Sequence, residues 1–202
     1  LATDDFVGIS FWLISMGMLA ATAFFFMEQA NVSTQWRKSV NVAGLVTGIA
    51  FIHYMYMRAV WVETGETPTV YRYIDWLITV PLQIIEFYLI LRVCTNVSSG
   101  LFWRLLAASL VMLIAGFMGE TGSNEMICFV IGMAGWLYII YEVFTGEAGK
   151  LNASSGNAAA QQAFSTIRLI VTVGWAIYPI GYFLGMGTNA DMAGANLIYN
   201  LA

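Results

Sequence analysis

The chain has 202 residues, of which 59% are hydrophobic and only 10% are charged, and its formal net charge is -4. A soluble domain carries about 25% charged residues, so this chain has too few to cover a water-facing surface. The composition predicts an integral membrane protein. No basic run is present, which argues against a nucleic-acid partner, and the two cysteines and one histidine have no spacing typical of a metal site.

Six apolar segments are long enough to cross a bilayer as helices, since one crossing takes about 20 residues. We predict an all-α membrane protein in which residues 1–202 form a single transmembrane domain. The stretch 152–157, between the last two full spans, predicts a flexible loop. The predicted spans are 6–27, 39–61, 70–92, 101–118, 125–144 and 163–184, and the start of one more helix follows near Ala195.

Charged residues are distributed unequally between the two ends of these spans. Acidic residues gather at the end that includes the N-terminus, and most cations lie at the opposite end. Because Lys and Arg favour the cytoplasmic side, we expect a multi-pass membrane protein with its N-terminus outside. The cations at the predicted inner end are Arg37, Lys38, Arg92, Arg104, Lys150 and Arg168.

The span 70–92 contains three ionisable residues, Arg72, Asp75 and Glu86. Such residues are retained inside a membrane where they pair or line a polar interior. Asp75 and Glu86 are 11 residues apart in the sequence. That spacing is about three helical turns, so they share a face and lie roughly 16 Å apart. Thr79 lies on the same face, and Gln83 lies between the carboxylates. The layout indicates a proton relay; the alternative is a polar clamp between helices made by Arg72 and Asp75.

Several spans contain aromatic residues, and the span 39–61 contains a lone histidine near its middle. Aromatic residues at helical spacing are typical of plain packing, and the alternative is a cofactor pocket. His53 is either a satisfied interior histidine or, beside a carboxylate, a functional one. The aromatic group and its neighbouring proline are Trp76, Trp136, Tyr138, Trp175, Tyr178, Pro179 and Tyr182.

These segments resemble a known family. Residues 72–81 are similar to the third-helix signature of microbial rhodopsins. Residues 53–58, 86–90, 174–179 and 196–202 resemble the proteorhodopsin group of that family in particular. The resemblance covers the whole chain. It implies a seven-transmembrane-helix bundle that binds all-trans retinal as a protonated Schiff base.

The resemblance also implies roles for individual residues. Asp75 would be the Schiff-base counterion and proton acceptor, Glu86 the proton donor, and His53 the partner of the acceptor. Arg72 would lie on the exit side, and Thr79 would be the second position of the ion-selectivity triplet. Asp, Thr and Glu at these positions imply a light-driven outward proton pump of the bacterial inner membrane, which is a transporter and not an enzyme.

The cofactor site is implied in the same way. Gln83 occupies the position that separates blue-absorbing from green-absorbing members, where green forms carry Leu, so a blue-absorbing pigment is expected. Glu120 resembles a carboxylate with a role in proton release or oligomer contacts, and a homo-oligomer of five or six copies is implied. The residues expected at retinal are Trp76, Gln83, Trp136, Trp175, Tyr178 and Pro179.

The lysine that holds retinal in this family has no counterpart in residues 1–202. The family places an aspartate directly after the residue that matches Ala202, and the lysine four residues later. Lys38 and Lys150 are the only lysines present, and both are expected outside the membrane interior. We therefore expect the seventh helix to continue after Ala202. A photoreceptor that signals to a partner and a solute transporter without pigment are the alternatives.

Overall fold

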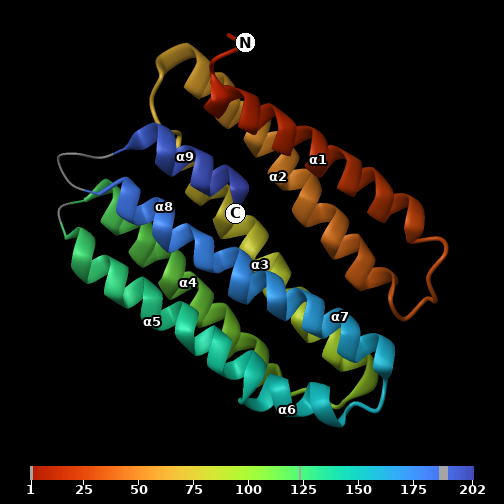
Figure 1. Ribbon diagram of the computed structural model, residues 1–202. Coiled ribbons are helices and arrows are strands. Elements are labelled where there is room, and N and C mark those ends of the chain that lie inside the picture. The colour runs from red at the N-terminus through yellow and green to blue at the C-terminus, as the bar shows by residue number, and fades with distance from the viewer. Residues whose placement is uncertain (1, 123, 187–190) are drawn as a thin grey trace.

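The computed structural model describes residues 2–122, 124–186 and 191–202, and in these residues the regular structure is entirely helical (Figure 1). The prediction of an all-α bundle is confirmed. Six helical segments are long and apolar enough to cross a membrane. The helices are α1 Phe6–Glu28, α2 Arg37–Thr64, α3 Thr69–Cys94, α4 Ser99–Thr121, α5 Glu125–Phe144, α6 Glu147–Ser154, α7 Ala158–Leu169, η1 Ile170–Gly174, η2 Trp175–Ile177, α8 Tyr178–Leu184 and α9 Met192–Leu201.

Helices that are consecutive in the chain pack against one another, α1 with α2, α2 with α3, α3 with α4 and α4 with α5. The last helix, α9, lies against both α8 and α1, so it joins the two ends of the bundle (Figure 1). Short connections between long helices favour this antiparallel arrangement. As a result, α3 is surrounded by neighbours, and side chains on its inner face meet residues from α2, α8 and α9.

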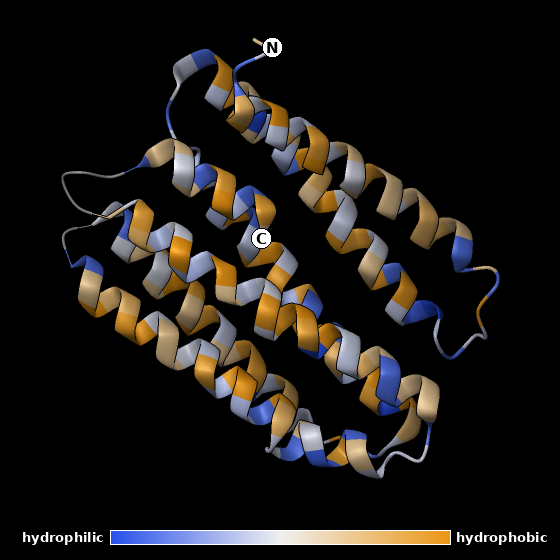
Figure 2. Ribbon diagram, in the orientation of Figure 1, coloured by the Kyte–Doolittle hydropathy of each residue, from blue (hydrophilic) through white to orange (hydrophobic). Residues whose placement is uncertain are grey.

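Many large apolar side chains on the long helices are exposed. Hydrophilic residues gather at the helix ends and connections (Figure 2). Phe6, Ile52 and Val130 are each more than half exposed, although all three lie within long helices. In water such a surface would be unfavourable, whereas in a bilayer it faces hydrocarbon. The surface is therefore that of a membrane-embedded bundle.

The prediction of a flexible loop over 152–157 is wrong in its first half, because residues 152–154 form the last turn of α6. The sixth span also begins earlier than predicted, at Ala158, where the Asn157 side chain accepts a hydrogen bond from the Ala160 N–H at 3.0 Å. Polar composition suggested a loop here. The helices form nevertheless because side chains at their ends satisfy backbone donors.

One such group is the Glu142 carboxylate, which is buried at the corner between α5 and α6. It accepts a hydrogen bond from the Glu147 N–H at 2.9 Å and lies 3.4 Å from the Arg104 guanidinium. Arg104 also pairs with the Glu147 carboxylate at 2.6 Å. These contacts fasten α6 to α4.

Replacing Glu142 by Ala should destabilise the folded protein, because it leaves a buried backbone donor without a partner. The expected loss is about 1–3 kcal/mol. Glu147→Ala is the matched control; its ion pair is partly exposed, so the expected loss is only about 0.2–1 kcal/mol. Thermal unfolding in detergent measures both. Equal losses would show that the Glu142 contact does not stabilise this corner.

The sixth span is irregular in its middle. A π-helical turn, η1, is followed by a 3-10 turn, η2, and Pro179 occupies the second position of α8. Proline lacks a backbone N–H, and π-helical turns occur often at functional sites. The indole of Trp136 donates a hydrogen bond to the Val171 carbonyl at 3.0 Å within this segment. The irregular segment carries Trp175 and Tyr178 toward the centre of the bundle.

Candidate ligand-binding site

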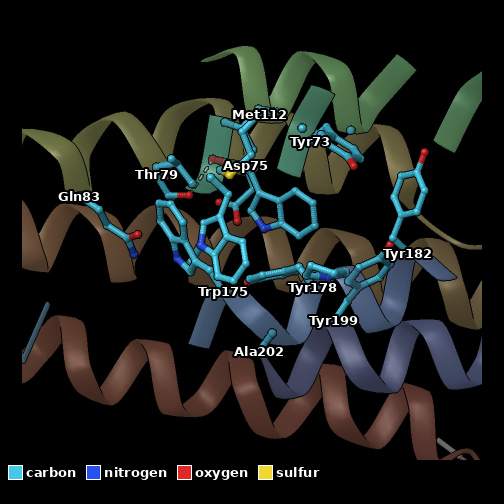
Figure 3. A pocket seen from close by; sticks show the side chains of 18 of the residues that line it. Tyr73, Asp75, Thr79, Gln83, Met112, Trp175, Tyr178, Tyr182, Tyr199 and Ala202 are labelled. Carbon is cyan, nitrogen blue, oxygen red and sulfur yellow. Dashed lines mark hydrogen bonds between the residues drawn. The ribbon is translucent and has the colours of Figure 1, made fainter. Parts of the chain in front are cut away.

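A cavity of about 330 Å³ lies in the middle of the bundle (Figure 3). Its walls come from α1 to α5, from the irregular part of the sixth span and from α9. Asp75, Trp175 and Tyr178 converge on this space from α3, η2 and α8. The sequence-predicted residues that line it are Asp75, Trp76, Thr79, Gln83, Trp136, Trp175, Tyr178 and Pro179.

Asp75 is the buried carboxylate of this cavity, with 2% of its surface exposed. One carboxylate oxygen lies 3.2 Å from Nδ1 of His53, which comes from α2. The same nitrogen lies 3.1 Å from the Ile49 carbonyl oxygen. A proton on Nδ1 is therefore placed between two acceptors. His53 has the carboxylate neighbour that separates a functional histidine from a merely satisfied one.

Thr79 follows Asp75 by one turn of α3. Its hydroxyl donates to the backbone carbonyl of Asp75 at 2.9 Å, which is an ordinary bond for threonine inside a helix. The bond fixes the rotamer of a small polar side chain in the cavity wall. Thr79 and Asp75 thus present adjacent polar groups to the same space.

Arg72 is fully buried, one turn before Asp75. Its Nη2 donates to the Asn196 side-chain oxygen at 2.5 Å, and its guanidinium lies 4.4 Å from the centre of the Tyr199 ring. In the described part of the chain, no carboxylate lies within ion-pair distance of Arg72. Arg72 contacts α9 and Asp75 contacts α2, as expected of a polar clamp between helices. A clamp alone, however, gives no reason for Asp75 to line a cavity.

Glu86 lies outside the cavity, toward the C-terminal end of α3. The Ser39 hydroxyl, in the first turn of α2, donates to Oε1 of Glu86 at 3.3 Å. Gln83 lies between the two carboxylates in sequence and lines the cavity. The buried side-chain oxygen of Gln83 has no hydrogen-bond partner among the residues described. The amide is therefore not engaged by a neighbouring helix.

Sequence reasoning missed a second polar cluster, at the other end of the cavity. Oε1 of Glu120 accepts hydrogen bonds from the hydroxyls of Tyr73 and Tyr199, both at 2.8 Å. The three residues come from α4, α3 and α9, so no spacing within one helix could have revealed the cluster. Tyr138, which belonged to the aromatic group weighed between packing and a cofactor pocket, is more than a third exposed on α5 and does not line the cavity.

The cavity suits an apolar ligand that carries a positive charge. Its walls are mostly apolar and aromatic, as in small-molecule sites generally. Asp75 offers a negative charge to a bound cation. Lys38 is the second residue of α2 and Lys150 lies in α6; neither belongs to the cavity wall.

The fold and the site define a helical membrane protein with an aromatic ligand cavity that contains a buried carboxylate. The family model for bacteriorhodopsin-like proteins matches residues 5–202, and the chain belongs to this family. Rhodopsins carry a retinal chromophore, and the cavity described above fits that group: aromatic side chains for the polyene and Asp75 for a cationic end.

Known proteins of this family are similar over nearly the whole chain. A blue-light absorbing proteorhodopsin of Gamma-proteobacterium Hot 75m4 is 57% identical, with 98% of this chain and 80% of the relative covered. A green-light absorbing proteorhodopsin of Gamma-proteobacterium EBAC31A08 is 54% identical, with 100% and 82% covered. The crystal structure of blue light-absorbing proteorhodopsin from Med12 matches with a TM-score of 0.85 at 57% identity, with 97% and 89% covered. The chain is thus a proteorhodopsin-like protein of a bacterial membrane.

Proposed function

We propose that the protein is a light-driven outward proton pump that uses retinal held as a protonated Schiff base. The observation that supports this most is the position of the Asp75–His53 pair at the cavity, with Glu86 on the same helix beyond it. One carboxylate at the ligand and one nearer the inner end give a proton one site on each side of a membrane-embedded switch.

Each residue has a role that follows from its position relative to the cavity. Bound retinal would supply the light-driven isomerisation and a Schiff base whose affinity for its proton changes with that isomerisation. The Asp75 carboxylate balances a cation in the cavity and receives a proton on one of its oxygens. His53 stabilises the charged form of Asp75, and the Thr79 hydroxyl keeps the adjoining wall polar. Glu86 delivers a proton from the inner side, where Ser39 holds its carboxyl group.

Arg72 lies on the side of Asp75 opposite to Glu86 along α3. A proton that leaves Asp75 on the side away from Glu86 therefore passes this buried cation on its way out. The net result of one cycle is one proton moved out, against roughly 2.3 kcal/mol for each 100 mV of membrane potential.

The setting of the pump follows from the charge pattern. We place the N-terminus outside and the cations near Arg37 and Arg168 inside, because cytoplasmic ends of spans are rich in Lys and Arg. Retinal would be bound to the lysine that the family resemblance implies. The resemblance also implies a homo-oligomer of five or six copies.

The proposal is tested with the full-length protein in its membrane, supplied with all-trans retinal. A coloured pigment should form, and a light flash should release a proton to a pH-indicator dye outside before one is taken up. A coloured pigment with a photocycle but no proton release would favour the photoreceptor alternative. A colourless membrane would favour a transporter without pigment.

Gln83→Leu should shift the absorption band to longer wavelength while proton release is retained. In the ground state the positive charge of retinal lies near the Schiff base, and light moves it toward the ring. The polar amide of Gln83 therefore stabilises the ground state more than the excited state. Removing such a dipole from a weakly screened cavity should lower the excitation energy by about 1–3 kcal/mol.

An absorption spectrum of the purified variant measures this shift. Gln83→Met, which also lacks the amide but keeps the unbranched shape, should move the band in the same direction. Parent and variants with the same absorption maximum would remove Gln83 as the tuning residue, and the expectation of a blue-absorbing pigment with it.

A further inference from the structure

The guanidinium of Arg72 is held by a neutral amide from the last helix. Arg72 is fully buried, and a buried charge is stable where hydrogen bonds and nearby groups compensate for lost water. Its Nη2 donates a hydrogen bond to Oδ1 of Asn196 on α9. The ring of Tyr199, one turn further along α9, lies against the same guanidinium. α9 thus supplies both contacts.

The orientation of the Asn196 side chain is determined by its own bonds. Asn196 is fully buried. Its Nδ2 donates to the Met192 carbonyl at 2.8 Å, and its Oδ1 also accepts from the Thr67 hydroxyl at 3.3 Å. Because the amide nitrogen donates to the Met192 carbonyl of its own helix, the amide oxygen points at Arg72. Because Thr67 precedes α3, this oxygen lies at the N-terminal end of α3, away from Asp75.

Arg72 nevertheless lies close enough to Asp75 to affect it. The two residues are three positions apart on α3, a spacing that makes side chains neighbours on a helix. Among the described residues, His53 contacts Asp75, and Tyr54 and Tyr178 line the same cavity. A guanidinium that turned toward Asp75 would stabilise the carboxylate, and one held further away stabilises it less.

We propose that Asn196 is a positioning residue for Arg72: its amide oxygen holds the guanidinium toward the N-terminal end of α3 and so limits the positive charge presented to Asp75. This inference rests on the proposed function only for its optical readout, in which the colour of bound retinal reports the protonation of Asp75. It assigns to α9 a part in setting the pH range over which Asp75 can accept a proton.

Two substitutions should have opposite effects. Asn196→Leu removes the acceptor with little change of volume, which frees Arg72 to approach Asp75, so the colour transition of the pigment should move to lower pH. Asn196→Asp adds a charge that pairs with Arg72, so the transition should move to higher pH. Each shift should be on the order of one pH unit, the size expected when a buried charge moves by a few ångströms at an effective dielectric constant near 20.

Thr67→Val is the matched control, because Thr67 donates to the same Asn196 oxygen but carries no charge. It should leave the colour transition in place. A purely structural role for Asn196 would lower the stability of both Asn196 variants without shifting the transition in opposite directions. The titration is read from absorption spectra, so it gives an answer whether or not the pigment pumps protons.

Nitrogen NMR of the protein in lipid vesicles gives a second readout that needs no pigment. In the parent, the Nη2 signal of Arg72, identified by its loss in Arg72→Lys, should lie apart from those of unbonded guanidinium nitrogens. In Asn196→Leu it should move toward them. An unchanged Arg72 signal, or Asn196 variants that both shift the colour transition in one direction, would overturn the proposal.

Discussion

Asp75→Asn is expected to abolish light-driven proton release while the protein still folds and binds retinal. Asparagine has the shape of the aspartate side chain but cannot take up a proton on its side-chain oxygen at neutral pH. Among the described residues, Asp75 is the carboxylate that His53 contacts at the cavity, so the substitution removes the acceptor from that position. Flash-induced pH changes in vesicles measure the loss, and the absorption band should move because the counter-charge is gone.

Asp191→Asn is the matched control. Asp191 is exposed and caps α9, and asparagine is an equally good cap, so proton release should be unchanged. The same mechanism predicts a loss in the parent at acid pH: a protonated Asp75 cannot accept, so release fails as pH falls through its titration and returns as pH rises. Undiminished release by Asp75→Asn would mean that another group accepts the proton.

Glu86→Gln is expected to slow recovery of the pigment after a flash, without preventing the first proton release. Glu86 is the carboxylate that α3 places beyond the cavity, and it is held by Ser39 from α2. A positioned acid contributes about 10²–10⁴-fold to the rate of a proton transfer, so recovery should slow by at least the lower value. Flash photolysis measures the recovery time.

Azide carries protons through small openings and should partly restore the recovery rate of Glu86→Gln. The rate in the variant should also become proportional to proton concentration, because protons then come from solution. Glu66→Gln, an exposed change in the α2–α3 connection, serves as the control and should leave recovery unaltered. Recovery as fast in Glu86→Gln as in the parent would leave Glu86 with a structural role.

Much of the fold could be predicted because spanning helices are defined by local hydropathy. The ends of α3 and α5 were predicted within two residues or better, since charged residues and Gly or Thr flank them. Helix α6 was missed because its stability depends on Glu142 and Arg104, which lie in other helices. Hydropathy carries no information about such contacts.

The candidate site divides in the same way. Asp75, Thr79 and Glu86 could be assigned to one face, and Gln83 to a position between the carboxylates, because helical spacing is a property of a single segment. From the sequence, His53 could only be predicted to be functional if a carboxylate lay beside it. Its contact with Asp75 depends on how α2 packs against α3. The bonds of Asn196 with Arg72 depend on α9, more than 100 residues away, and neither spacing nor composition points to them.

The most direct test of the pump is net proton movement by intact cells that make the full-length protein with retinal. Under steady illumination in unbuffered medium the outside should become acidic, and a protonophore should abolish the change. Asp75→Asn cells with the same amount of pigment should show no change in either condition. Coloured cells whose medium stays at constant pH in the light, or turns alkaline, would contradict an outward proton pump.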